Sequence, residues 1–226
     1  MSDTAYEYLS GNTNPMFLVV AGNIGSGKTT LTRKLAERLN WRPHFESVTD
    51  NPYLSDFYGD MERWSFPLQV YFLTHRFNTH QEIEKGSASS IQDRSIYEDA
   101  HIFARALFEQ GDLSKRDYEN YLTLYQSMIQ YLNPPTLTIF LKRSIPKLQE
   151  RIQMRGRDYE QSIPVDYLTK LNHYYDEWYD SYSQGKSLLV DTDDLDFLEN
   201  EEHFDQLVQK IYSSIDQQDM FFQSMF

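Results

Sequence analysis

The chain has 226 residues, a formal charge of −13 and no cysteine, so it is long enough for a substantial core and has no disulfide or thiolate zinc site. The acidic balance argues against a nucleic acid polymer as partner, because such binding depends on a basic surface, and no apolar run reaches membrane-spanning length. We therefore expect a cytoplasmic protein with a loose leader at 1–15 and one domain at 16–226.

The first predicted strand, 16–21, leads directly into Gly-Asn-Ile-Gly-Ser-Gly-Lys-Thr at 22–29, a complete G-x-x-x-x-G-K-[ST] pattern. Leucines recur every four residues after it and predict a helix at 28–39. A glycine-rich loop at a helix N-terminus surrounds phosphate oxygens with backbone N–H groups. Lys28 adds a positive charge for the β- and γ-phosphates, and Thr29 offers a hydroxyl to Mg²⁺. The pattern predicts binding of a nucleoside triphosphate.

The rest of the chain alternates apolar runs with helical segments, which predicts an α/β fold with a doubly wound parallel sheet. Residues 51–59 predict a short helix or an ordered loop, and Asn133-Pro134-Pro135 ends a long helix before a strand. The further strands are expected at 43–47, 89–93, 136–142 and 187–191, and the further helices at 65–84, 98–109, 114–132, 144–155, 164–183 and 203–216. The strand ends near 46, 93 and 191 should face the crevice beside the phosphate loop.

Charged residues follow the predicted strand at 89–93. Asp93 at its tip can hold Mg²⁺ through water, and the adjacent Arg94 can touch a transferring phosphate. The alternative is that Asp93 caps the helix beginning near 98. The chain has no N-K-x-D base-reading motif of GTPases, and no apolar strand ends in the Asp-Glu pair of many ATPases. A GTPase switch and an ATPase with that Asp-Glu pair are therefore disfavoured.

Three arginines gather near the end of the predicted helix at 144–155. Arg151 and Arg155 share a helix face, and Arg157 follows Gly156. Guanidiniums this close favour an anion among them, as when a mobile lid at about 151–163 closes over the γ-phosphate. The alternative is a solvated basic helix end. A phosphate loop with an arginine lid predicts a small-molecule kinase, and Glu46 at a strand end is the candidate general base.

Together these motifs resemble the deoxyribonucleoside kinase family, in particular its bacterial purine-directed branch, over most of the chain. The matching segments are the phosphate loop at 22–29, Glu46, the stretch with Tyr58, Trp64-Ser-Phe-Pro-Leu-Gln69 and Arg76, the run Asp93-Arg-Ser-Ile-Tyr-Glu-Asp99, and Arg155-Gly-Arg-Asp-Tyr-Glu160 continuing through Ile163-Pro164 to Tyr167-Leu168. The resemblance implies a P-loop kinase fold, a five-stranded parallel sheet flanked by helices, with an arginine-bearing lid. This chain differs from the family pattern at two positions. It has Asp93 where many relatives have Glu, and Tyr159 where the lid often has an acidic residue.

The resemblance also implies a role for each matching residue. Glu46 would accept the proton of a 5′-hydroxyl that attacks the γ-phosphate of ATP, with Arg94 holding that hydroxyl end. Tyr58 and Glu160 would bind the sugar 3′-hydroxyl, and Thr29 and Asp93 would organise Mg²⁺. Gln69, Arg76 and Asp99 would read the base, while Trp64, Phe66 and Phe103 would stack on it or flank it. The implied ATP-binding residues are Gly22, Asn23, Ile24, Gly25, Ser26, Gly27, Lys28, Thr29, Thr30, Arg151 and Arg155, with Arg157 closing on the phosphates and the loop 191–197 near the adenine.

The base-reading residues favour a purine. Gln69 presents a donor and an acceptor side by side, which suits adenine, and Asp99 paired with Arg76 presents an acceptor for an amino group and a donor for N7 or O6. Thymine lacks the amino group. We expect deoxyadenosine as the favoured acceptor in nucleotide salvage, with deoxyguanosine and deoxycytidine as secondary acceptors.

Other functions remain open from the sequence: a deoxycytidine or broad-specificity kinase, a thymidylate-type monophosphate kinase, or a non-catalytic relative. The resemblance further implies a homodimer through a helix bundle. Helices 65–84 and 114–132 would build it, with Leu68, Phe72 and His75 on the first and Tyr118, Tyr121, Leu122 and Tyr125 on the second.

Overall fold

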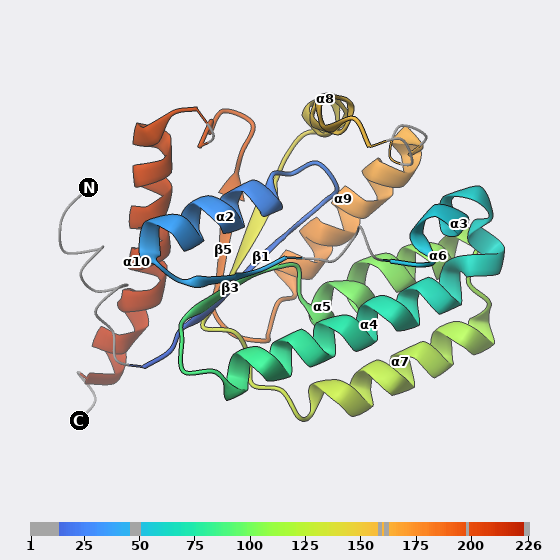
Figure 1. The fold of residues 1–226 in the computed structure, drawn as a ribbon, viewed down its shortest axis with the longest axis horizontal. Coiled ribbons are helices and arrows are strands. Elements are labelled where there is room, and N and C mark those ends of the chain that lie inside the picture. The colour runs from blue at the N-terminus through green and yellow to red at the C-terminus, as the bar shows by residue number, and fades with distance from the viewer. Residues whose placement is uncertain (1–13, 46–50, 158–159, 161–162, 198, 224–226) are drawn as a thin grey trace.

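A computed structural model describes residues 14–45, 51–157, 160, 163–197 and 199–223. Its strands and helices alternate along the chain, as Figure 1 shows. In chain order they are β1 (Phe17–Gly22), α2 (Lys28–Leu39), β2 (Arg42–His44), α3 (Leu54–Gly59), α4 (Met61–Lys85), β3 (Ser90–Asp93), α5 (Ile96–Glu98), the π-helix η1 (Asp99–Ala104), α6 (Arg105–Gln110), α7 (Lys115–Ile129), β4 (Leu137–Lys142), α8 (Ile145–Arg155), α9 (Val165–Asp180), β5 (Ser187–Asp191) and α10 (Glu201–Gln223).

The strands form one five-stranded parallel sheet in the order β2-β3-β1-β4-β5. The central strand β1 pairs with β3 on one side, where Val20 lies opposite Asp93, and with β4 on the other, where Gly22 lies opposite Leu141. All six β1 residues are buried, as a strand covered on both faces requires. Strands β2 and β3 lie on one side of β1, and strands β4 and β5 lie on the other. The strand order therefore reverses at β1, and in open parallel sheets ligands bind in the crevice at the carboxyl end of such a strand. The predicted sheet is confirmed.

Helices cover both faces of the sheet and make three layers (Figure 1). On one face, leucines of α2 and apolar residues of α10 such as Phe204 and Ile211 pack on β1, β3 and β4. On the other face, a larger cluster joins α3, α4, α7 and α9 around buried aromatics including Tyr121 and Trp178. The asymmetry matters for the site because the thicker layer supplies most of the cavity walls.

The predicted elements are all present, with shifted ends. Helix α4 begins at Met61, four residues before the expected start, because Asp60 caps it by accepting a hydrogen bond from the backbone N–H of Arg63 at 3.1 Å. Pro67 lies inside α4, where its missing N–H removes one intrahelical bond without ending the helix. Helix α7 ends at Ile129, ahead of the proline pair, and α10 extends to Gln223. Strand β2 covers 42–44, and 46–47 lie outside the described residues.

The segment expected as one helix over 98–109 is a composite. It begins as α5, continues as a π-helix at Asp99–Ala104 and ends as α6. A π-helical turn inserts an extra residue and is frequently found at functional sites. Here it carries Asp99 and Phe103, which both face the cavity described next.

Candidate active site

The phosphate loop connects β1 to α2 as the sequence predicts. Helix α2 has no side-chain cap at Gly27, so its first N–H groups are left for an anion. Gly25 has φ +83°, and a Cβ there would lie 2.8 Å from the carbonyl oxygen of Leu148, so only glycine fits. The Lys28 side chain is buried, and its Nζ donates to the carbonyl oxygen of Asn23 at 2.7 Å across the loop. These features make a cradle for phosphate groups.

Asn23 ties this loop to α9. Its Nδ2 donates to the carbonyl oxygen of Leu168 at 2.9 Å and to Oδ1 of Asn172 at 2.7 Å, while Asn172 donates to the carbonyl oxygen of Arg143 at 2.8 Å. No local pattern pointed to Asn172, because it lies in an ordinary amphipathic helix far along the chain. The loop conformation therefore depends on a helix that the motif does not contain.

Thr29 and Asp93 meet at the carboxyl edge of the sheet, as predicted. Oγ1 of Thr29 donates to Oδ2 of Asp93 at 2.5 Å, and Oδ1 of Asp93 is buried without a hydrogen-bond partner among the described residues. A hydroxyl and a carboxylate with a spare oxygen are ligands that suit Mg²⁺, which keeps several waters and takes few protein ligands. Among the described residues, no three His, Cys, Asp or Glu side chains form a group that could hold a metal ion.

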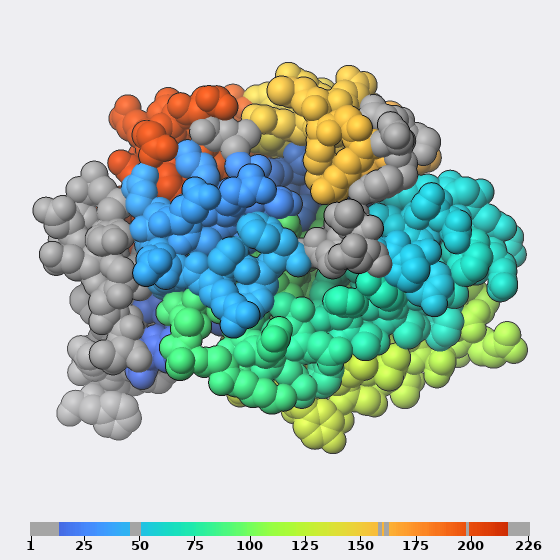
Figure 2. Space-filling view, viewed as in Figure 1, coloured from blue at the N-terminus to red at the C-terminus, as the bar shows by residue number. Residues whose placement is uncertain are grey.

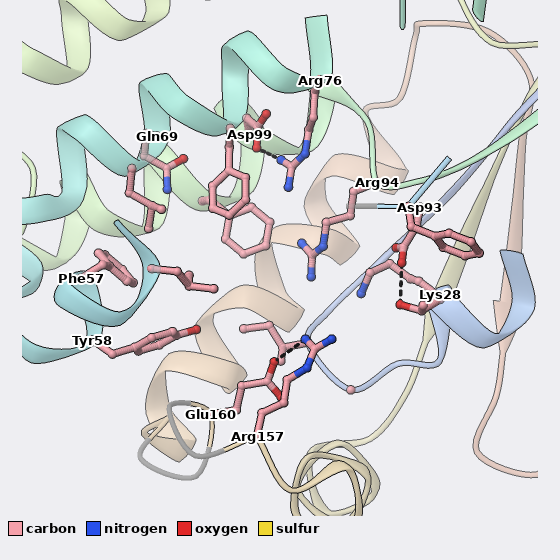
Figure 3. A pocket seen from close by; sticks show the side chains of 18 of the residues that line it. Lys28, Phe57, Tyr58, Gln69, Arg76, Asp93, Arg94, Asp99, Arg157 and Glu160 are labelled. Carbon is pink, nitrogen blue, oxygen red and sulfur yellow. Dashed lines mark hydrogen bonds and ion pairs between the residues drawn. The ribbon is translucent and has the colours of Figure 1, made fainter. Parts of the chain in front are cut away.

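A central cavity of about 130 Å³ opens beside the phosphate loop. Figure 3 shows Gln69, Arg76 and Asp99 at one end, Lys28 and Asp93 at the other, and the Arg94 side chain pointing between them. The lining residues are Ile24, Gly25, Lys28, Thr29, Phe45, Leu54, Phe57, Tyr58, Leu68, Gln69, Phe72, Arg76, Asp93, Arg94, Asp99, Phe103, Arg155, Arg157, Glu160 and Tyr167. Its aromatic walls suit a flat, partly apolar ligand with polar ends.

The inner end of the central cavity consists of Gln69, Arg76 and Asp99. Arg76 and Asp99 form an ion pair whose side chains are only 7% and 1% exposed. Gln69 is also buried, and its Oε1 has no hydrogen-bond partner among the described residues. A buried amide oxygen without a partner is costly unless a ligand group satisfies it. The predicted trio therefore lies together and leaves hydrogen-bonding capacity for a ligand.

A third part of the wall, which we call the outer end, consists of Tyr58, Arg155, Arg157 and Glu160. In Figure 3, Tyr58, Arg157 and Glu160 lie across the cavity from Arg76 and Asp99. Both oxygens of Glu160 accept from arginines: Oε2 from Arg155 at 3.0 Å and 2.5 Å, and Oε1 from Arg157 at 3.1 Å. The arginine side chains remain about one-third exposed while Glu160 is buried. Arg155 and Arg157 thus neutralise Glu160, the residue that was predicted to bind the sugar. An anionic ligand would compete with Glu160 for the same guanidiniums.

A second hollow, the phosphate-loop cavity of about 380 Å³, shares Gly25, Lys28, Thr29, Arg155 and Arg157 with the central cavity. In Figure 2 the yellow atoms of α8 stand beside the blue atoms of the phosphate-loop region. Its lining residues are Gly25, Gly27, Lys28, Thr29, Thr30, Arg33, Arg143, Arg151, Met154, Arg155, Arg157, Leu195, Asp196 and Phe197. The expected residues Thr30, Arg151 and Arg155 and the loop before Phe197 are therefore brought together.

Arg143 lines this second cavity and was not predicted from the sequence. Arg143 is buried and donates to Oγ1 of Thr192 at 3.0 Å and to the carbonyl oxygen of Thr192 at 2.7 Å. Burial, with the nearby charge of Arg151, lowers the pKa of the Arg143 guanidinium. Arg143 follows β4 directly, so its position at a strand end was the available signal.

Several predicted ligands lie elsewhere. Trp64 and Phe66 do not line the central cavity: Trp64 packs near Tyr53, with a ring separation of 5.9 Å, and Phe66 is half-buried against the larger core cluster. The α4 residues that line the cavity, Leu68, Gln69, Phe72 and Arg76, share one helix face, and Trp64 and Phe66 lie to either side of that face. Phe57 and Phe72 take the wall positions instead. Phe103 lines the cavity as expected, and Glu46 and Tyr159 lie outside the described residues.

The faces assigned to a helix bundle also need correction. Leu68 and Phe72 of α4 line the central cavity, and Tyr121 and Tyr125 of α7 are buried in the core of the same chain.

Among the described helices, none is long and apolar enough to cross a membrane.

Comparison with known proteins connects this geometry to one family. The family model described as deoxynucleoside kinase matches residues 18–216. The chain is 38% identical over 200 residues to a deoxyadenosine/deoxycytidine kinase of Bacillus subtilis, covering 88% of this chain and 92% of that protein. It is 41% identical to a deoxyadenosine kinase of Dictyostelium discoideum, covering 74% of this chain and 68% of that protein.

A solved structure has the same fold. A deoxyadenosine kinase from M. mycoides with bound dATP superimposes with a TM-score of 0.76 at 27% identity, covering 87% of this chain and 98% of that one. The same enzyme with dCMP and dCDP bound gives a TM-score of 0.78 at 26% identity, covering 88% of this chain and all of the other.

Proposed function

The chain belongs to the deoxynucleoside kinase family and is an ATP-dependent deoxynucleoside kinase, and we propose that its favoured acceptor is deoxyadenosine, phosphorylated at the 5′-hydroxyl. The observation that carries this preference is the buried trio Gln69, Arg76 and Asp99, placed at the opposite end of the central cavity from Lys28 and Asp93. A nucleoside lying along the cavity would present its base to the trio and its 5′-hydroxyl to the phosphate loop.

The charges of the inner end support an amino-bearing base. Ionised Asp99 is only an acceptor, and its pairing with Arg76 favours the ionised state. It would accept from an exocyclic amino group, while the side-chain amide of Gln69 would pair with the adjacent ring nitrogen and amino group. A keto oxygen facing Asp99, as in thymine, would be repelled. Relatives named deoxyadenosine kinase at 35–41% identity fit this preference.

Deoxycytidine is the second candidate, because its base also carries an amino group beside a ring acceptor. A B. subtilis relative is named for both deoxyadenosine and deoxycytidine, and the M. mycoides deoxyadenosine kinase has been solved with dCTP. Relatives named deoxyguanosine kinase are 32–35% identical and keep deoxyguanosine as a third candidate.

The residues around the phosphate loop would each have a different role in phosphoryl transfer. Lys28 and the loop amides would hold the β- and γ-phosphates, and Arg94 would bind the oxygen atoms between donor and acceptor. Arg151, Arg155 and Arg157 would close on the phosphates as a lid. Arg155 and Arg157 would then exchange their bonds to Glu160 for bonds to phosphate. Glu160, together with Tyr58, would bind the 3′-hydroxyl of the sugar. Glu46 would take the proton of the 5′-hydroxyl. Thr29 and Asp93 would hold Mg²⁺, which supplies positive charge to the phosphate oxygens.

A homodimer through a helix bundle remains part of the proposal, with a changed surface. Phe66, Val70 and Phe77 of α4 are half-buried and lie on one stripe at helical spacing, and Leu124 of the neighbouring helix α7 is 36% exposed. Sedimentation equilibrium of the full chain tests this: a dimer that Val70→Glu converts to a monomer supports this surface, and an unchanged dimer contradicts it.

The function is tested by steady-state kinetics with Mg-ATP and each of the four natural deoxynucleosides, with deoxyadenosine monophosphate as a control acceptor. The highest kcat/KM with deoxyadenosine supports the proposal. The highest value with thymidine overturns the base assignment, and activity with the monophosphate alone indicates a monophosphate kinase. Phosphorylation of none of these acceptors indicates a non-catalytic relative.

A further inference from the structure

Glu98, the last residue of α5, is fully buried and joins three separate segments. Its Oε1 accepts from the backbone N–H of Ser95 at 3.1 Å, closing a capping box. Its Oε2 accepts from the hydroxyl of Tyr175 on α9 at 2.6 Å and, at a longer 3.4 Å, from the backbone N–H of Gly22. Glu98 thus holds the first residue of the phosphate loop as well as its own helix. A capping role alone would use only the bond to Ser95.

The same carboxylate lies beside Arg94. Nη1 of Arg94 is 3.8 Å from Oε2 of Glu98 and donates to the hydroxyl of Tyr175 at 3.3 Å. The guanidinium lies over the ring of Phe103, 4.6 Å from its centre, and lines the central cavity. The backbone of Arg94 has φ +67°, a left-handed conformation that residues other than glycine seldom adopt. A strained backbone and three side-chain partners fix the direction in which this guanidinium points.

We propose that Glu98 and Tyr175 are positioning residues for phosphoryl transfer, holding the Arg94 guanidinium in fixed relation to the start of the phosphate loop. Neither residue lines the central cavity or the phosphate-loop cavity, so neither would touch nucleotide or nucleoside. The inference deepens the proposed kinase reaction and rests on it for its kinetic readout. Arg94 would bind the phosphoryl group between donor and acceptor, and Glu98 would act through Arg94.

The hydroxyl of Tyr175 connects Glu98 with Arg94. Its hydroxyl donates to Glu98 and accepts from Arg94, so the phenol must stay protonated, and burial raises its pKa well above the usual value. Asn172, three positions earlier on α9, holds Asn23 of the phosphate loop. One face of α9 therefore holds both Arg94 and the loop, and removing the Tyr175 hydroxyl should free Arg94 while leaving the contact between Asn172 and Asn23.

The molecule contains a matched copy of this arrangement, in which the charged pair is partly exposed and the tyrosine is buried. Arg105 and Glu109 repeat the spacing of Arg94 and Glu98, with Nε to Oε1 at 2.8 Å, and Tyr174, the neighbour of Tyr175, donates to Glu109. The Arg105 and Glu109 side chains are 35% and 41% exposed, and neither lines either cavity. Substitutions in this copy change the same chemical groups without reaching the site, which makes them controls for the buried set.

The test compares Glu98→Gln and Tyr175→Phe with Glu109→Gln and Tyr174→Phe. We expect kcat with Mg-ATP and deoxyadenosine to fall about 30- to 100-fold in Glu98→Gln and about 10-fold in Tyr175→Phe, because small displacements of a transition-state ligand are costly. The KM for ATP should stay within about threefold, and calorimetric titration should still find one ATP site per chain, because the loop itself remains. Both controls should retain kcat within about twofold.

Three results would overturn the proposal: kcat within about twofold of wild type in both buried variants, an activity loss that merely parallels loss of ATP sites, or an equal loss in the controls. Tyr175→Phe keeps the shape of the side chain and decides the matter if Glu98→Gln does not fold.

A second readout needs no turnover and separates this inference from the proposed function. Exchange of the Arg94 guanidinium protons, assigned by ¹⁵N-arginine NMR with Arg94→Lys, should be slow in wild type and fast in both buried variants. Equal exchange in all three overturns the proposal. A wild type that phosphorylates no deoxynucleoside, yet shows this difference, contradicts only the proposed function.

Discussion

The inner and outer ends of the central cavity use the same chemical pair, an arginine beside a carboxylate, in different surroundings. At the inner end, Arg76 and Asp99 are both almost completely buried, so their pairing cannot be exchanged for water. At the outer end, Arg155 and Arg157 are one-third exposed while they hold Glu160. A buried pair of this kind is costly to break, whereas a partly exposed pair contributes little and rearranges readily.

The difference suggests a division of work between the two ends. The inner pair provides a fixed pattern of donors and acceptors, as recognition of one base requires. The outer pair provides guanidiniums that can leave Glu160 when phosphate arrives, as closure over ATP requires. On the proposed function, burial more than residue type would separate base specificity from closure over ATP in this site.

The largest effect should come from breaking the inner pair. Asp99→Ala removes the acceptor and leaves Arg76 buried without its partner, so kcat/KM for deoxyadenosine should fall by about 2–4 kcal/mol in transition-state stabilisation. Steady-state kinetics measure this, with Glu109→Ala as the exposed control. If Asp99→Ala keeps wild-type kinetics with deoxyadenosine, the assignment of this pair to base recognition is wrong.

Breaking the outer pair should cost less. Glu160→Gln keeps the shape but removes the charge that Arg155 and Arg157 share, and we expect kcat/KM to fall by about 1–2 kcal/mol through the lost sugar contact. The free energy of unfolding, measured by urea titration, should change by less than about 1 kcal/mol because both arginines are accessible to water. If the free energy of unfolding falls by more than the transition-state stabilisation does, the contacts of Glu160 with the two arginines serve mainly to stabilise the fold.

The smallest effect concerns pH and the π-helix that carries Asp99. His101 stacks on Trp178 with ring centres 5.8 Å apart, and burial, together with the charge of Arg105, lowers its pKa. The folded chain therefore takes up a proton less readily than the unfolded chain, so stability is complete above the ordinary histidine pKa of about 6.5 and falls as the pH decreases below it. The slope is at most about 1.4 kcal/mol per pH unit for each such histidine.

Urea titrations at pH 7 and pH 5.5 measure this slope in wild type and in His101→Phe, which keeps the stacking. The variant should lose less stability on acidification, although His80, whose pKa burial also lowers, keeps part of the dependence. The same slope in both proteins would exclude His101 as a contributor.

The sequence predicted the parts of this site that local patterns encode. The phosphate loop and the meeting of Thr29 with Asp93 follow from motif spacing and from the alignment of parallel strand ends. The pairing of Arg76 with Asp99 was likewise predicted, from the opposite charges of two residues that the family resemblance places beside the base. The family and the sheet order around β1 are consistent with these motifs.

Other parts depend on tertiary packing that no local pattern reveals. The family resemblance implied Trp64 and Phe66 as stacking residues, but the packing of α4 places Phe72, about one turn beyond Gln69, at the cavity wall. Glu98 and Tyr175 are far apart in sequence and meet only through the packing of α9. The π-helix had no signal because its residues suit an ordinary helix equally well.

The most direct test of the division between the two ends is a cycle that removes one group from the substrate and one from the protein. Wild type and Asp99→Ala are each assayed with deoxyadenosine and with the purine deoxynucleoside that lacks the 6-amino group. Wild type should prefer deoxyadenosine by about 10- to 100-fold in kcat/KM, as a hydrogen bond to a charged group predicts, and Asp99→Ala should lose most of that preference. A preference that is unchanged in the variant would contradict base reading by the inner end.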